Sequence, residues 1–172
     1  MKTTIQETDV LMESDVCCPE FDPTLLDNKK HEWTDKLFLK DSIPEFFHVP
    51  LPKTFGKAVT RMWKKVNDAD AAPDAKDFLL LAYDPTPFKS ELLMSITKEI
   101  PGEEVAKLSG TYYSKVFDGP YNQVPKYMKE MNKYLASMQL KAKKYFFHYA
   151  YCPDCAKKYG HNYVMALAEV KC

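Results

Sequence analysis

The same order of elements occurs twice along this chain, and that repetition restricts the folds open to it. In each copy a strand pattern precedes an amphipathic helix, and two further strand patterns follow. The first helix starts after Pro52, and the second follows Asn122, a residue suited to a helix N-cap. One such unit is too small to bury both faces of a sheet, so we expect the two units to pack together.

We therefore predict an α+β fold of two strand–helix–strand–strand modules related by a pseudo-twofold axis, with a mostly antiparallel sheet and two main helices. The modules span about 36–100 and about 107–171, within one domain over 36–172. Residues 1–35 hold nine acids against three lysines, and two prolines interrupt any regular pattern, which predicts an acidic irregular arm. We expect the arm to pack on the domain through its larger apolar side chains, Phe21, Leu25, Leu26 and Trp33.

Charge and hydropathy exclude several classes of partner. The 172 residues include 24 basic and 24 acidic side chains, and Arg61 is the one arginine, which is a poor composition for binding nucleic acid. No apolar run approaches the roughly 18 residues of a membrane span. Acids stand where a secretory signal is apolar, so we expect a cytoplasmic protein with no membrane partner.

Aromatic side chains dominate the second module. In a strand over residues 144–151, Phe146 and His148 fall on one face, and the other face carries Tyr145, Phe147, Tyr149 and Tyr151. A tyrosine-rich face offers flat apolar walls with hydroxyl tips, which suits a planar organic ligand. The plainer interpretation is that these rings form core. Trp63, on the buried stripe of the first helix, either lines a cleft or packs there.

Five cysteines include one C-x-x-C pair, Cys152 and Cys155, which separates a strand from a short helical turn. Three interpretations stay open: a redox pair with a lowered thiol pKa, half of a zinc site, or a tight turn. A structural zinc site has four ligands, so Cys17, Cys18 or His161 would have to complete it. Completion by Cys17 or Cys18 requires the acidic arm, residues 1–35, to fold back onto the domain; we call this arm the leader below.

One stretch resembles a known family. Residues 91–100, then Gly110-Thr111-Tyr112, then Gly119-Pro120-Tyr121 opening a helix over 122–137, resemble the centre of the GyrI-like small-molecule-binding (effector-binding domain) family. The resemblance is close over 78–138 and extends in outline over 36–172. It implies a ligand cleft between two modules, in a stand-alone bacterial member because no length remains for a helix-turn-helix. Multidrug-binding relatives place an acid near the position of Met165, whereas here the nearest acid is Glu169.

We thus expect the chain to bind a small apolar or aromatic molecule in a tyrosine-rich cleft, as a monomer or homodimer and without a cofactor. The expected ligand contacts are Trp63, Tyr112, Tyr121, Tyr145, Phe147 and Tyr149. Two alternatives stay open: a hydrolase of a reactive small organic compound on the same frame, and a thiol or zinc protein using Cys152 and Cys155. For hydrolysis, Glu91 is the candidate general base, with Tyr112 or Tyr149 polarising the substrate. No G-x-S-x-G, Walker or G-x-G-x-x-G motif is present, and whether the chain is an enzyme stays open.

Overall fold

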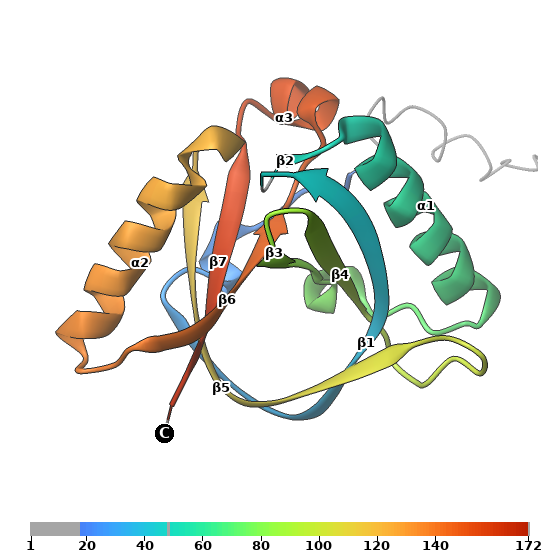
Figure 1. The fold of residues 1–172 in the computed structure, drawn as a ribbon, viewed down its shortest axis with the longest axis horizontal. Helices are drawn as coiled ribbons and strands as arrows, with labels where there is room; N and C mark the ends of the chain where they lie inside the picture. Colours follow the sequence, from blue (N-terminus) through green and yellow to red (C-terminus); the bar gives the residue numbers. More distant parts are fainter. Residues whose placement is uncertain (1–17, 48, 172) are drawn as a thin grey trace, which may run out of the picture.

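A computed structural model describes residues 18–47 and 49–171 of the chain (Figure 1). Its strands are β1 (Lys29–Phe46), β2 (Val49–Pro50), β3 (Leu80–Thr86), β4 (Lys89–Ser95), β5 (Val105–Asp118), β6 (Ala142–Tyr149) and β7 (Tyr163–Val170). Its helices are α1 (Pro52–Asp68), α2 (Val124–Ser137) and α3 (Pro153–Tyr159), with 3-10 turns η1 (Pro23–Leu25), η2 (Ala75–Asp77) and η3 (Tyr121–Gln123). Within these described ranges, no helix combines the length and apolarity needed to cross a membrane.

The strands form one antiparallel sheet that closes on itself. Their order is β2-β1-β4-β3-β6-β7-β5, and β1 also pairs with β5, so six strands complete a ring (Figure 1). The 18 residues of β1 make this closure, because their first part pairs with β5 and their last part pairs with β4. The register of β1 against β5 shifts between Trp33 and Lys36, where Asp35 has a positive φ of 49°. Such a bulge bends a strand, as a barrel requires.

Alternation along the strands divides the apolar side chains between the inside and the outside of the ring. The inner face carries one buried cluster, drawn from all six strands of the ring and the residue before β3: Phe38, Leu79, Leu81, Leu93, Tyr112, Phe146, Met165 and Leu167. The barrel is therefore filled by its own side chains along much of its length.

The two long helices cover different parts of the outer face. Met62 and Val66 of α1 pack with side chains of β1, β3 and β4, and Met131 and Leu135 of α2 pack with side chains of β5, β6 and β7. The two helices therefore flank the barrel on opposite sides, and α3 lies between them at one end (Figure 1). Arg61 ties α1 to β1 by donating two hydrogen bonds to the Asp41 carboxylate, at 2.6 and 2.9 Å.

The predicted α+β class and the antiparallel sheet are confirmed. The main elements follow one another as β1–β2–α1–β3–β4 and then β5–α2–β6–α3–β7, and the duplication and pseudo-twofold relation of the modules stay predictions. The expectation of an irregular arm is wrong over residues 29–35, which belong to β1. Within residues 18–28, Phe21 and Leu26 pack on the body as expected, whereas Leu25 is 53% exposed because η1 turns it outward.

Candidate functional site

The outer face of β3 and β6, between α1 and α2, carries three of the six predicted ligand contacts. Ala82 of β3 lies beside Phe147 of β6 in the antiparallel register. Tyr145, Phe147 and Tyr149 alternate with the inward-facing Phe146, and all three pack toward α2. We call this surface the central face. The prediction of a shared strand face is confirmed for these three rings, whereas Tyr151 lies beyond the end of β6 and stacks on Tyr159 of α3.

Tyr149 and Tyr121 form a pair at one end of the central face. Their ring centroids lie 5.1 Å apart in an edge-to-face arrangement, and the Tyr121 hydroxyl donates to the carbonyl oxygen of Tyr151. Burial raises the pKa of Tyr149 well above its usual value, and the charges of Asp84, Tyr121 and Glu45 act in the same direction. Burial also raises the pKa of Tyr121 to about 12. Both phenols are therefore neutral at physiological pH.

Glu45 is a buried carboxylate on the same outer side of the sheet. Glu45 lies in β1, two residues after Ile43, and Ile43 packs under α1. The Glu45 side chain is buried, with 7% of the residue exposed. Glu45 was not among the residues predicted from the sequence. The alternation Ile43-x-Glu45 was the available signal, since one continuous strand places both side chains on one face.

Tyr145 and Trp63, two of the predicted ligand contacts, each contact another side chain of the protein. Tyr145 donates its hydroxyl to Asn132 of α2, and its ring stacks on Phe147 with centroids 6.3 Å apart. Trp63 stacks on Phe78 at 5.1 Å and is 37% exposed. Tyr145 thus anchors α2, whereas Trp63 presents part of its indole to solvent beside the sheet.

The structure places two predicted residues elsewhere. Tyr112 lies inside the barrel, 1% exposed, with its ring 4.6 Å from that of Trp33. Glu91 alternates with the outward-facing Leu92, so it belongs to the inner side of β4, where its carboxylate lies 3.6 Å from the Lys40 ammonium. Neither side chain joins the residues of the central face.

Three thiols meet where the leader crosses the start of α3. The sulfur atoms of Cys18, Cys152 and Cys155 all lie within 4.8 Å of one another. The leader therefore folds back onto the C-x-x-C pair, which was the condition for a completed site. His161 lies 2.7 Å from Asp118 and is not a member of this cluster, and Cys17 lies outside the described residues.

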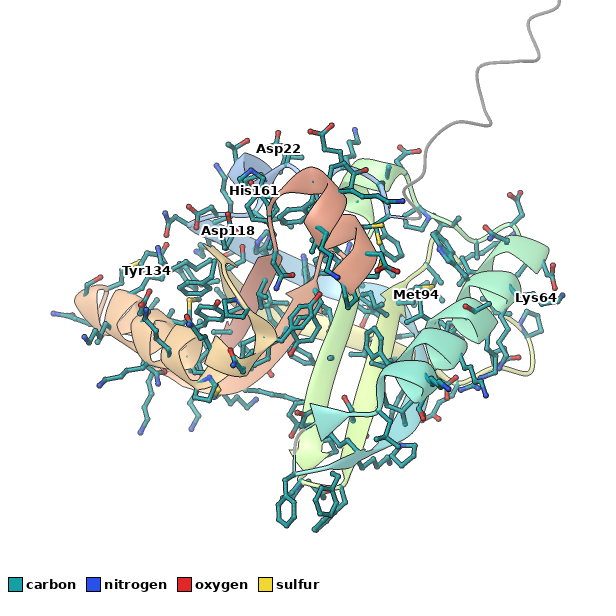
Figure 2. The ribbon with its side chains drawn as sticks, turned by 90° about the horizontal axis from the view of Figure 1, so that it is seen from above. Asp22, Lys64, Met94, Asp118, Tyr134 and His161 are labelled. Carbon is teal, nitrogen blue, oxygen red and sulfur yellow. The ribbon has the colours of Figure 1, made fainter. Side chains whose placement is uncertain are left out.

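A hollow of about 460 Å³ lies between residues 20–23 of the leader and the segment that contains α3. Asp22 and His161 stand together at its edge, close to α3 (Figure 2). Its lining is mainly aromatic and includes two acidic side chains: Glu20, Phe21, Asp22, Pro23, Tyr151, Tyr159, His161 and Tyr163. The structure thus offers a concave aromatic surface that the sequence analysis did not predict.

Comparison with solved structures shows a shared fold at very low identity. The C-terminal domain of EcmrR matches with a TM-score of 0.62 at 9% identity, over 84% of this chain and 97% of that domain. A hydrolase from Listeria innocua matches with a TM-score of 0.60 at 10% identity, over 84% and 92%. An uncharacterized conserved protein from the same organism matches with a TM-score of 0.58 at 11% identity, over the same shares.

No curated protein sequence matches this chain. A family model does: the model described as "Bacterial hydrolase" matches residues 8–170, which include most of the leader as well as the barrel and its helices. On that match, the chain belongs to the bacterial hydrolase family.

Proposed function

We propose that this chain binds a small aromatic or apolar molecule on the central face, in the manner of a GyrI-like effector-binding domain. The observation that carries the proposal is the Tyr121–Tyr149 pair, 5.1 Å apart, at the end of an aromatic surface that two helices flank. Phe147 supplies an apolar floor beside it, and Trp63 supplies a half-exposed ring on the α1 side.

The chemistry of these groups favours a planar ligand with one polar atom. Aromatic rings gain free energy by edge-to-face and offset contacts with a flat partner. The neutral Tyr149 hydroxyl donates or accepts a hydrogen bond but supplies no charge. The buried Glu45 carboxylate adds negative potential on the same outer side of the sheet. This potential favours a ligand that carries a positive charge or hydrogen-bond donors on one edge.

Tryptophan fluorescence gives a direct test. The chain has two tryptophans, so a Trp33→Phe variant leaves Trp63 as the only indole. We expect N-phenyl-1-naphthylamine, a neutral aromatic dye, to quench Trp63 saturably and to raise the melting temperature. Adding Tyr149→Ala should weaken dye binding about tenfold, because loss of a ring contact costs about 1.4 kcal/mol.

The hollow beside α3 supplies the matched control for this test. His161→Ala changes the lining of the hollow but not the central face. If His161→Ala weakens dye binding and Tyr149→Ala does not, the ligand binds in the hollow and the proposal for the central face is wrong.

Hydrolysis is the second candidate function, and Glu45 is the observation that favours it. A buried carboxylate near neutral phenols is an arrangement that general-base catalysis uses, with the carboxylate activating water and a phenol polarising the substrate. Glu91, predicted from the sequence for the same role, lies on the inner side of the sheet beside Lys40. The two acids therefore make separable predictions.

We would measure hydrolysis of 4-nitrophenyl acetate and of styrene oxide by the full chain. Glu45→Gln should lower the rate about a hundredfold if Glu45 is the base. Glu91→Gln is the matched control, and it should leave the rate unchanged. The reverse pattern would restore Glu91 as the base and place the chemistry inside the barrel.

A further inference from the structure

The three thiols come from distant parts of the chain, so their meeting depends on the whole fold. Cys18 belongs to the leader, whereas Cys152 and Cys155 frame the first turn of α3 after β6. All three sulfur atoms lie within 4.8 Å of one another, Cys155 is buried, and the other two are half-buried. Local sequence explains the closeness of the C-x-x-C pair but not the presence of Cys18.

Backbone contacts hold the leader at this place. The Tyr159 hydroxyl donates to the carbonyl oxygen of Cys18 at 2.8 Å, and the backbone N–H of Phe21 donates to the Tyr151 hydroxyl at 2.8 Å. The rings of Tyr151 and Tyr159 stack with centroids 4.5 Å apart, so the two anchoring hydroxyls come from one rigid pair. Cys18 is therefore placed by contacts that do not involve its own sulfur.

Two sulfurs also receive backbone hydrogen bonds. The N–H of Cys152 points at the Cys18 sulfur over 3.3 Å, and the N–H of Cys155 points at the Cys152 sulfur over 3.5 Å. Such N–H donors stabilise thiolates more than thiols, and they are a usual outer shell of thiolate metal sites. Proton loss from thiols this close together needs a compensating positive charge, because neighbouring thiolates repel one another.

The spacing of the sulfurs matches a tetrahedral metal centre after small movements. With metal–sulfur bonds of about 2.3 Å, tetrahedral geometry sets the sulfurs about 3.8 Å apart. Three thiolates form a soft donor set, which selects zinc over magnesium or calcium. A disulfide would use only two of the three sulfurs and would leave the third without a role.

We propose that Cys18, Cys152 and Cys155 bind a zinc ion that fastens the leader to the start of α3. A water molecule completes the four ligands. The ion is structural: it joins two segments that are 134 residues apart in sequence. It also fixes the chain around Tyr151, whose carbonyl oxygen receives the Tyr121 hydroxyl of the central face.

The first test measures metal in the full chain purified with reductant and without chelators. We expect native mass spectrometry to show one zinc per chain. After removal of zinc, anaerobic titration with Co²⁺ should reach its endpoint at one equivalent. The product should show thiolate-to-cobalt charge-transfer absorption and the intense d–d bands of a tetrahedral site.

Single cysteine variants locate the ligands. Cys18→Ser is the main variant, since Cys18 lies in the leader and its replacement leaves the barrel core intact, whereas Cys155 is buried. We expect Cys18→Ser to weaken zinc binding at least a hundredfold and to increase proteolytic cleavage of the leader. His161→Ala is the control, because His161 pairs with Asp118 and is not a member of the thiol cluster, and this variant should retain zinc.

Three outcomes would overturn the proposal. Substoichiometric zinc together with a cobalt spectrum lacking charge-transfer bands would show that the thiols hold no metal. Equal zinc content in Cys18→Ser and the parent chain would place any zinc elsewhere. A mass lower by two protons, reversed by reductant, would instead identify a disulfide. Each of these outcomes is measured as metal content or mass and not as dye binding, so the failure of this proposal is distinguishable from that of the central-face proposal.

Discussion

Histidine 148 shows at the scale of one residue how burial on the inner side of the sheet shapes the behaviour of the protein. It is 4% exposed, and the backbone N–H of Leu80 donates to its Nδ1 at 3.1 Å. Burial lowers the pKa of His148. Burial also lowers the pKa of His31, and the positive charge of Lys36 adds a smaller effect in the same direction. Both imidazoles are therefore neutral in the folded protein at neutral pH.

This burial predicts a loss of stability in mild acid. As the pH falls below the ordinary histidine pKa of 6.5, these two histidines bind protons in the unfolded chain, whereas in the folded protein His148 and His31 stay unprotonated to lower pH. The free energy of unfolding then falls with pH, by up to about 1.4 kcal/mol per pH unit for each histidine. Urea unfolding of His148→Gln between pH 7 and about pH 5 should show a shallower dependence. An unchanged slope in this variant, with His31→Gln as the comparison, would contradict the prediction.

At the scale of an element, helix α1 contains a glycine that its packing does not require. Gly56 lies within the helix, and an added Cβ there would meet no atom within 4 Å. Alanine restricts the unfolded chain and favours the helix, so Gly56→Ala should raise the free energy of unfolding by about 0.5–1 kcal/mol. Gly119→Ala is the opposing control, because a Cβ there would overlap the Tyr127 hydroxyl. Thermal unfolding of both variants should show shifts of opposite sign, and a loss in both would contradict this account.

The leader segment makes a second prediction at this scale. The Phe21 ring lies 5.8 Å from that of His148 and 5.5 Å from that of Tyr163, so it packs against the start of β7. Phe21→Ala should lower the free energy of unfolding by about 1–2 kcal/mol. Leu25→Ala, in the same segment but more than half exposed, should change it by less than about 0.5 kcal/mol. Similar losses in the two variants, measured by urea unfolding, would mean that Phe21 has no special packing role.

Local patterns predicted the elements of this molecule but not their closure into a ring. The 3.6-residue stripes gave α1 from Pro52, and the alternation around Phe147 gave the two faces of β6. Nothing local indicated that residues 29–35 continue the strand that carries Phe38, since the bulge at Asp35 breaks the alternation there. Ring closure is a long-range pairing, and sequence periodicity carries no information about strand partners.

The candidate site was predictable to the same extent. Tyr145, Phe147 and Tyr149 follow from alternation, whereas Glu45 required the knowledge that β1 is continuous. Cys18 joined the C-x-x-C pair through a chain reversal that no spacing rule specifies. Residues contributed by one strand were thus within reach of sequence reasoning, and residues assembled from several segments were not.

At the scale of the whole molecule, we expect β1 to couple the two predicted modules into one cooperative unit. It pairs with β4 of the predicted first module and with β5 of the predicted second one, so unfolding of either module would leave a sheet edge of the other unpaired. The two tryptophans report on different places, because Trp33 packs at the barrel interior and Trp63 stacks on Phe78 under α1. Urea unfolding of Trp33→Phe and of Trp63→Phe, monitored by the fluorescence of the remaining tryptophan, should give transitions of the same width. The two midpoints should also agree once the stability change caused by each substitution, measured by circular dichroism, is subtracted. Two separated fluorescence transitions would show that the modules unfold independently and that the ring formed through β1 contributes little to stability.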